Sequence, residues 1–392
     1  MPRFSSRLRW ESPRNPLALH LEEIRRRGAG IIDLTRSNPT QVGLPYPEAE
    51  IRSAFGIPEA LLYEPAARGL PEARRAIAAW ETRGGLETDP ERLVLTAGTS
   101  EAYAFLFNML LDPAEEVLIP RPSYPLLELL AQMAGVRLVP YALHYDGRWR
   151  LDLEMLQRAA GPRARAIVVV HPNNPTGSFL HRDEAAGLRR LCQERDLALI
   201  SDEVFSGYAL MEDRLREPTL AGSDEVLTFR LDGLSKSAGL PQAKLAWIRV
   251  DGPEPAVRQA LDRLDLVADT FLSVGGPVQH AARRLLELGE RVRQQILGRL
   301  LANLAALRTA LQSHPTCTLL EPEGGWSAIL RLPAVRSDEE WALTLLEKDR
   351  VLVQPGYFYD FEQEALVVLS LLPATEEFAA GIHRLLRRVE AA

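Results

Sequence analysis

The stretch AIVVVHPNNPTG, residues 166–177, joins five consecutive apolar residues to a polar segment that contains two prolines and a glycine. An uninterrupted apolar run, unlike an alternating one, is typical of a strand that is buried on both faces of a sheet. The segment after it is rich in the residues that end strands and begin turns. The stretch therefore predicts a central strand whose carboxyl end carries polar side chains.

The same pattern repeats on both sides of this stretch, with helical segments in between. Short apolar runs occur at residues 92–95, 116–119 and 197–200, and helical patterns at residues 101–111, 126–133 and 182–195. Strands and helices in alternation predict an α/β fold with a mainly parallel sheet. Ligands of such sheets bind beyond the carboxyl ends of the strands, where several polar clusters of this sequence fall.

Both ends of the chain are predicted to form a second, smaller lobe. The N-terminal part carries a helix and a short strand at residues 31–34, and the C-terminal part has a long helical stretch at residues 277–311, short strands and a final helix with an apolar face. We therefore expect residues 1–45 and 276–392 to form a small α+β domain and residues 46–275 to form a large domain.

The composition excludes several classes of protein. The chain has 392 residues, of which 46% are hydrophobic and 25% charged, and its formal net charge is −7. This mixture is typical of a folded globular protein and excludes a disordered one. The negative charge gives no electrostatic basis for binding nucleic acid or an anionic membrane. No apolar run approaches the roughly 18 residues that cross a bilayer, and no apolar segment follows the basic N-terminus as in a secretory signal.

The cysteines favour a reducing compartment. The chain has two, Cys192 and Cys317, which lie far apart and lack the spacing of a zinc-ligand pair. We expect two packed thiols, no disulfide framework, no metal site and a cytoplasmic location.

Polar motifs at the predicted strand ends carry the functional signal. They are SNPT (residues 37–40), YEPAARG (63–69), TAGTS (96–100), PSY (122–124), HPNNPTG (171–177), SDEVF (201–205), LSK (234–236) and PGYFYDF (355–361). In their order and spacing they resemble the class I and II aminotransferases of pyridoxal-phosphate fold type I, over nearly the whole chain. The resemblance implies a mainly parallel seven-stranded sheet in the large domain, a smaller domain built from both chain termini, pyridoxal phosphate as cofactor and a homodimer with shared active sites. The implied reaction transfers an amino group between an amino acid and a 2-oxo acid.

Three residues match the positions that carry the chemistry in this family. Lys236 matches the lysine that forms a Schiff base with the cofactor, and Asp202 matches the carboxylate that keeps the pyridine nitrogen protonated so that the ring withdraws electrons. A lysine shielded from water has a lowered pKa, so that enough neutral amine exists to attack. Asn174 matches the amide that donates to the phenolic oxygen of the cofactor. The simpler interpretations are that Lys236 is a surface lysine, that Asp202 is a helix N-cap and that Asn174 is a turn residue.

Other matches concern the ring and the phosphate of the cofactor. Tyr124 matches the aromatic residue that stacks on the ring, although a core tyrosine is the simpler interpretation. The TAGTS motif precedes a predicted helix, whose N-terminus offers free amides to a phosphate or forms a simple capping turn. Tyr63 resembles the tyrosine that reaches the phosphate of the neighbouring subunit across an isologous interface. The predicted cofactor-binding residues are Tyr63, Gly98, Thr99, Ser100, Tyr124, Asn174, Asp202, Phe205, Ser235, Lys236 and Lys244.

Three positions around the cofactor depart from the family pattern. Phe205 replaces a tyrosine whose hydroxyl donates to the phenolic oxygen, so we expect a higher pKa of the Lys236 imine than in relatives with the tyrosine. Lys244 replaces a phosphate-binding arginine and lacks the bidentate geometry of a guanidinium, although a surface lysine is the simpler interpretation. Gly233 replaces a serine or threonine donor. We expect a lower cofactor affinity than usual.

The fourth departure concerns the substrate. Val368 stands where many relatives carry the arginine that binds the substrate α-carboxylate, and valine has no hydrogen-bond donor. Arg36 is the first candidate replacement and Arg68 the second, although a surface arginine is always the simpler interpretation. Tyr357 and Tyr359 are expected either near the pocket or packed between the lobes. The predicted substrate-binding residues are Arg36, Ser37, Asn38 and Asn174.

Two other functions stay open at this point. The same cofactor chemistry serves carbon–sulfur lyases and other elimination or decarboxylation enzymes, and the valine at position 368 strengthens this alternative. A non-catalytic sensor of pyridoxal phosphate is the second alternative. In some regulators such a sensor accompanies a DNA-binding module, for which the sequence before Leu17 is too short.

Overall fold

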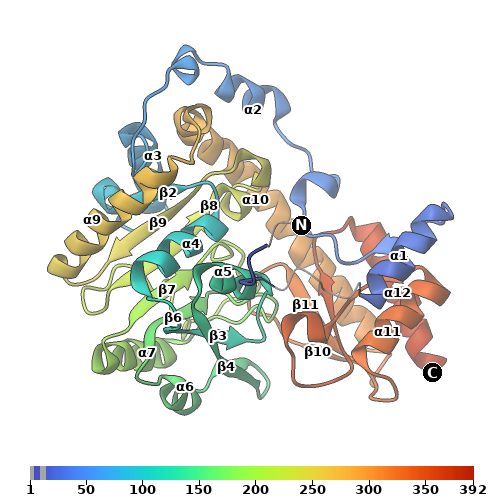
Figure 1. Ribbon diagram of the computed structural model, residues 1–392. Coiled ribbons are helices and arrows are strands. Elements are labelled where there is room, and N and C mark those ends of the chain that lie inside the picture. Colours follow the sequence, from blue (N-terminus) through green and yellow to red (C-terminus); the bar gives the residue numbers. More distant parts are fainter. Residues whose placement is uncertain (1–3, 9–14) are drawn as a thin grey trace.

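An eight-stranded sheet forms the larger part of the molecule in the computed structural model, which describes residues 4–8 and 15–392 (Figure 1). Four neighbouring pairs are parallel and three are antiparallel. In spatial order the strands are β2 (Leu93–Thr96), β9 (Ala246–Asp251), β8 (Thr228–Gly233), β7 (Ala198–Asp202), β6 (Ala164–Val170), β3 (Glu116–Arg121), β4 (Arg137–Tyr145) and β5 (Trp149–Leu151).

The apolar stretch that opened the sequence analysis is β6, a central strand as predicted. Val168 packs into the hydrophobic cluster on one face of the sheet, and its neighbours Ile167 and Val169 pack into the cluster on the other face. Because successive side chains of a strand point to opposite faces, a strand covered on both sides needs apolar residues at every position.

The number of strands differs from the seven that were expected. The eighth strand is β5, which folds back against β4 and pairs with it in antiparallel register. Gly147, at a φ of 109°, lies in the turn between the two strands. The hairpin has only three residues in its second strand, too few for a recognisable pattern in the sequence.

Helices cover both faces of this sheet. Side chains of α4, α5 and α9 belong to the cluster on one face, and those of α6 and α7 to the cluster on the other. A third cluster joins α3, α8 and α10 to the edge formed by β2 and β9. These helices are α3 (Pro71–Arg83), α4 (Thr99–Leu110), α5 (Leu126–Ala134), α6 (Leu153–Ala159), α7 (Arg182–Arg195), α8 (Leu234–Ser237), α9 (Glu254–Phe271) and α10 (Gly276–Leu311).

A smaller lobe combines segments from both ends of the chain. Its four-stranded antiparallel sheet has the order β10 (Thr318–Leu320), β11 (Ser327–Arg331), β14 (Leu366–Ser370) and β13 (Gln354–Pro355). A separate parallel pair joins β1 (Ile32–Asp33) to β12 (Val351–Leu352). The helices around them are α1 (Pro16–Arg26), α11 (Asp338–Thr344) and α12 (Thr375–Glu390).

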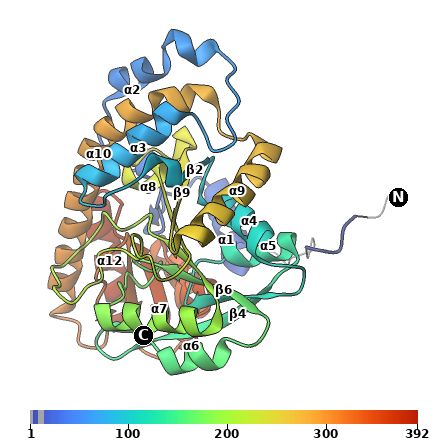
Figure 2. The same ribbon diagram turned by 90° about the vertical axis from the view of Figure 1, so that its left-hand side faces the viewer.

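The long helix α10 connects the two parts. It packs beside α3 and α2 (Glu48–Phe55) near the large sheet, and its C-terminal half packs against α12 of the smaller lobe (Figure 2). The predicted domain boundaries stay a prediction, and residues 1–3 and 9–14 of the first predicted segment lie outside the described residues. Within the described residues, no helix has the length and apolar character that crossing a bilayer requires.

Candidate active site

A cavity of about 310 Å³ lies where the carboxyl ends of the central strands meet the smaller lobe. Large-sheet segments contribute Thr99, Tyr103, Ser123, Tyr124, Leu126, Leu127, Val170, Asn174, Asp202, Val204, Phe205 and Lys236. The smaller lobe and the segment after β1 contribute Thr35, Ser37, Trp326, Ser327, Gln354, Tyr359 and Ser370. The prediction that polar strand ends converge on one site is thus met by Asn174, Asp202 and Lys236.

Lys236 is the one amine among the described residues that line this cavity. It lies in α8, directly after β8, and its Nζ is 4.4 Å from the ring centroid of Trp326 and 5.3 Å from that of Phe205. Burial lowers the pKa of Lys236 to about 8, although the negative charge of Asp202 opposes this shift. A lysine with this pKa has a far larger neutral fraction near neutral pH than an ordinary lysine, and only the neutral amine is nucleophilic.

Asp202, the last residue of β7, supplies the buried acid. Only 9% of the residue is exposed. The hydroxyl of Tyr103 donates to its Oδ2 at 3.0 Å, and the backbone amide of Val204 donates to its Oδ1 at 3.3 Å. Burial raises the pKa of Asp202 to about 6. A carboxylate in this setting is stabilised by a cationic partner, such as a protonated ring nitrogen.

Several residues of the cavity, Tyr103, Trp326 and Gln354 among them, were not predicted from the sequence. Tyr103 lies one helical turn after Thr99, on the same face of α4, and that spacing was the only available signal. Trp326 packs edge-on against Phe205 with ring centroids 5.4 Å apart. It comes from the smaller lobe, and no local pattern indicates that the lobe would bring it beside Lys236.

The N-terminus of α4 offers an anion site. Gly98 and Thr99 are half-buried there, Ser100 is exposed, and Thr99 lines the cavity. The Nζ of Lys244 lies only 3.3 Å from the position that a Cβ on Gly98 would occupy. A cation therefore lies close to the N-terminus of α4, and a helix N-terminus with a nearby cation favours the binding of a phosphate.

The glycine at position 233 has a packing reason. A Cβ there would lie 3.0 Å from the Cα of Ala246 and 3.1 Å from the carbonyl oxygen of Leu245, in the neighbouring chain segment. A serine or threonine at this position would therefore push β8 away from β9. Ser235, on the first turn of α8, is half-buried and is absent from the cavity lining given above.

These residues fit pyridoxal phosphate by the chemistry of their donors. A buried amine of lowered pKa, a buried carboxylate and a cation close to a helix N-terminus correspond to the aldehyde, ring nitrogen and phosphate of this cofactor. Asn174 and Tyr124 line the same cavity.

Other predicted residues lie elsewhere. Tyr63 is 82% exposed and lines a different surface pocket, together with Gly275. Arg36 forms an ion pair with Glu377 at 3.2 Å and lies outside the lining of the cavity. Asn38 caps a short helix by accepting from the amide of Thr40.

Arg68 and Tyr357 also lie apart from the cavity lining. Arg68 pairs with Asp265 at 2.9 Å. The hydroxyl of Tyr357 accepts from Asn15 at 2.7 Å. No metal site was predicted, and this stays a prediction. The described residues do contain two clusters of metal-ligand type that share His181, one with Asp213 and Glu323 and one with Asp183 and Glu184. The Arg216 guanidinium packs 4.0 Å from the ring centroid of Phe179.

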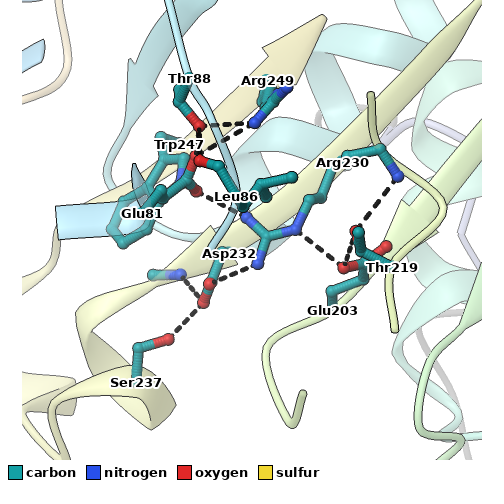
Figure 3. A network of polar contacts seen from close by, with 12 residues as sticks. Glu81, Leu86, Thr88, Glu203, Thr219, Arg230, Asp232, Ser237, Trp247 and Arg249 are labelled. Atoms are coloured by element: carbon teal, nitrogen blue, oxygen red, sulfur yellow. Dashed lines mark hydrogen bonds and ion pairs between the residues drawn. The ribbon is translucent and has the colours of Figure 1, made fainter. Parts of the chain in front are cut away.

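A buried network centred on Arg230 includes Glu203 and Ser237, the residues that follow Asp202 and Lys236 in the chain (Figure 3). The guanidinium donates to Glu203 at 2.8 Å, to Asp232 at 3.0 Å and to Glu81 at 2.6 Å. Glu203 follows Asp202 in the chain, and Asp232 accepts a short hydrogen bond from Ser237, the residue after Lys236. Burial acts to raise the pKa of Glu203, but the charge of Arg230 holds it below its ordinary value.

Comparisons with known proteins agree with this geometry. The chain matches the family model for aminotransferase class I and II over residues 40–373. It is 28% identical over 382 residues to the alanine aminotransferase of Mycobacterium tuberculosis, covering 95% of this chain and 88% of that protein. It is 26% identical to the glutamate-pyruvate aminotransferase AlaA of Haemophilus influenzae, covering 94% and 92% of the two chains. The solved structure of an alanine aminotransferase from Pyrococcus furiosus matches with a TM-score of 0.89 at 25% identity, over the full length of both chains.

Proposed function

The chain belongs to the aminotransferase class I and II family, and we propose that Lys236 is the lysine that carries its cofactor. Family membership confirms the resemblance drawn from the strand-end motifs, and with it the fold type, pyridoxal phosphate as cofactor and aminotransferase activity. The substrates are an amino acid and a 2-oxo acid. One observation carries the proposal for Lys236: its amine, with a pKa lowered to about 8 by burial, faces the same cavity as the buried Asp202.

Pyridoxal phosphate, when bound, supplies an electron sink that stabilises negative charge at the substrate α-carbon. The carboxylate of Asp202 would hold the proton on the ring nitrogen, and the Asn174 amide would donate to the phenolic oxygen. The α4 N-terminus would bind the phosphate together with Lys244. The Nζ of Lys236, once free and neutral, would move the proton between the substrate α-carbon and the cofactor.

Reduction with borohydride tests the assignment of Lys236. The chain has only three lysines, Lys236, Lys244 and Lys348, so a reduced cofactor tag must map to one of three peptides. We expect the tag on Lys236, its loss in Lys236→Ala and its retention in Lys348→Ala. A tag on Lys244 or Lys348 in the unaltered protein would contradict the proposal.

Single-turnover spectroscopy with an amino acid tests the reaction. Transamination converts the cofactor to its amine form and releases a 2-oxo acid, whereas a lyase releases ammonia and keeps the cofactor in its aldehyde form. We propose alanine and glutamate as the first donors, and pyruvate as the first acceptor. The alanine aminotransferase and the glutamate-pyruvate aminotransferase among the relatives support this choice.

We propose further that two copies of the chain share their active sites. Tyr63 is 82% exposed, and Leu61, Leu62 and Phe271 are exposed apolar side chains. Exposed apolar surface of this kind favours association with another protein surface. In such a dimer Tyr63 of each copy completes the phosphate site of the other. We also propose a cytoplasmic location, which the two buried free thiols, Cys192 and Cys317, support.

A further inference from the structure

The cavity around Lys236 must accept a carboxylate, because amino acids and 2-oxo acids both carry one. Among the described residues that line the cavity, Lys236 is the only positively charged side chain, and its amine is committed to the cofactor. Arg36 and Arg68 form ion pairs elsewhere. Within one copy of the chain, the described lining therefore offers only neutral hydrogen-bond donors to the carboxylate of the substrate.

Gln354 of the smaller lobe is a neutral donor whose orientation is fixed by a hydrogen bond. The hydroxyl of Tyr359 donates to Oε1 of Gln354 at 2.5 Å, and both side chains line the cavity. Burial raises the pKa of Tyr359, so its hydroxyl stays protonated and keeps donating. Within the described part of the chain, Nε2 of Gln354 has no hydrogen-bond partner. Its two protons are available to an acceptor that enters the cavity.

The strand register explains why this donor lies next to Val368. Gln354 on β13 is the cross-strand partner of Val368 on β14, and directly opposed residues of an antiparallel pair point to the same face of the sheet. Val368 is 1% exposed and packs in one hydrophobic cluster with Tyr359 and Trp149. Val368 therefore packs in the apolar cluster that contains Tyr359, and the polar side chain at this point of the sheet is Gln354 on the neighbouring strand.

A backbone hydrogen bond also connects the Gln354–Tyr359 pair to the large-sheet segment that lines the cavity. The amide of Ser123 donates to the carbonyl oxygen of Tyr359 at 3.0 Å. Ser123 and its neighbour Tyr124 line the cavity from the large sheet. The position of Gln354 is thereby linked to the segment that faces the ring of the cofactor.

We propose that Nε2 of Gln354 binds the carboxylate of the substrate, and that Tyr359 is a positioning residue that orients the amide by occupying its Oε1. This inference rests on the proposed function, since it assumes that substrates react at Lys236. It makes Gln354 a specificity-determining residue for substrates that carry a carboxylate next to the reacting amine.

A pair of small reagents tests the proposal without requiring turnover. Aminooxyacetate and methoxyamine both displace Lys236 from the cofactor and form an oxime, but only aminooxyacetate carries a carboxylate. The C=N bond to the lysine nitrogen breaks, a C=N bond to the reagent nitrogen forms, and the two amino protons of the reagent pass to the lysine. The absorbance change of the cofactor-loaded protein gives a rate constant for each reagent, and their ratio measures carboxylate recognition.

Four single variants separate hydrogen bonding from shape. A hydrogen bond to a charged group corresponds to about tenfold or more in affinity, so we expect Gln354→Leu to lower the ratio about tenfold. Gln354→Glu keeps the shape but opposes the carboxylate with a like charge, so the ratio should fall further. Tyr359→Phe frees the amide to rotate and should lower the ratio by a few-fold. Tyr357→Phe, two residues away and outside the cavity lining, is the matched control and should leave the ratio unchanged.

The outcomes distinguish this inference from the proposed function. Variants that slow both reagents equally, or a Gln354→Glu protein with an unchanged ratio, would overturn the role of Gln354. If neither reagent changes the spectrum of the unaltered protein, the assignment of Lys236 fails instead, since no imine is present to exchange.

Discussion

Burial changes the acidity of the two central side chains in opposite senses. The amine of Lys236 becomes easier to deprotonate, with a pKa of about 8, and the carboxyl of Asp202 becomes harder to deprotonate, with a pKa of about 6. Both shifts disfavour the charged form, as expected for groups removed from water. Each side chain gains from a bound cofactor, because an imine nitrogen replaces the isolated ammonium and a protonated ring pairs with the carboxylate.

The lowered pKa of Lys236 predicts how the cofactor-free protein takes up pyridoxal phosphate. Only the neutral amine attacks, so the rate constant should rise about tenfold per pH unit at low pH and level off above pH 8. A rapid-mixing absorbance measurement from pH 6 to 10 gives this profile. An ordinary lysine, with a pKa of 10.5, would instead show a rate that continues to rise through pH 9.

Phe205 predicts a second effect on the same nitrogen. The ring of Phe205 lies 5.3 Å from Nζ of Lys236 and offers no donor to the cofactor. In Phe205→Tyr the added hydroxyl stabilises the phenolic oxygen as an anion, so the imine nitrogen loses its proton at lower pH. We expect the pKa of the imine to fall by about one unit. Spectrophotometric titration of the loaded protein measures it, and an equal or higher pKa in the variant would contradict the expectation.

At the level of single residues, the sequence predicted the groups that stand at strand ends. Lys236, Asp202 and Asn174 follow apolar strands and carry recognisable motifs. Trp326 and Gln354 were not predicted, because they reach the cavity only through the way the smaller lobe packs against the large sheet. No spacing along the chain contains that information.

Among the elements, β8 and the loop after β7 depend on a single buried cation. Arg230 is the shared partner of Glu81, Glu203 and Asp232. We expect Arg230→Met to lower the free energy of unfolding by about 3–5 kcal/mol, because the buried carboxylates of Glu203 and Asp232 then lack a counter-charge. Urea denaturation of the cofactor-free protein measures the loss.

A solvent-exposed pair provides the control for this variant. Arg308 and Glu321 form an ion pair of 2.6 Å in which both side chains are 44% exposed. Arg308→Met should cost less than about 1 kcal/mol, since water screens such pairs. Similar losses in the two variants would show that the Arg230 network adds little to stability.

The contact between α10 and α8 predicts a different kind of change. A methyl group at Gly289 of α10 would overlap the Cβ of Ala238, next to the segment that carries Lys236. Gly289→Ala should therefore lower the free energy of unfolding by about 1–3 kcal/mol through overpacking. Gly298 of the same helix has open space around it, so Gly298→Ala should raise the stability by up to about 1 kcal/mol. Thermal unfolding of both variants measures this contrast, and a stabilised Gly289→Ala protein would contradict it.

Most elements could be predicted from the periodicity of apolar residues. The helices predicted at residues 101–111, 126–133 and 182–195 are α4, α5 and α7. The strand β5 was missed because its three residues, Trp149–Leu151, are too few for a pattern. The Arg230 network was not predicted, for another reason. It joins α3, β8 and the loop after β7 across the interior, and a sequence does not distinguish buried charged residues from charged residues on the surface.

For the whole molecule, shared active sites predict complementation between two inactive variants. Lys236→Ala lacks its own imine and Tyr63→Ala lacks the tyrosine for its partner, so each homodimer should be impaired. In a mixed dimer, the subunit with Lys236 receives Tyr63 from the other copy, which restores one site of two. Random mixing should return about a quarter of the wild-type activity.

Two measurements test the dimer and the sharing of its active sites separately. Sedimentation analysis should give a mass twice that of the 43.7 kDa chain. Activity after mixing that equals the mean of the separate variants would contradict shared sites, even if the protein is dimeric.

At this scale the sequence predicted the two-part architecture and the family, because motifs spread over nearly the whole chain agree in order. It could not predict which cation, if any, faces the substrate. Arg36 and Arg68 were reasonable candidates near the motifs, but their ion pairs with Glu377 and Asp265 depend on tertiary contacts.

The parallel pairing of β1 with β12 has a consequence for biosynthesis. Ile32 pairs with Val351, so a nascent chain on the ribosome carries its early strand without a partner until almost all of the polypeptide has emerged. Domains of a growing chain fold in the order of their synthesis, and the large sheet is therefore complete first. A premature stop codon just before Val351 would leave that early strand permanently unpaired, as an open edge that other chains can join.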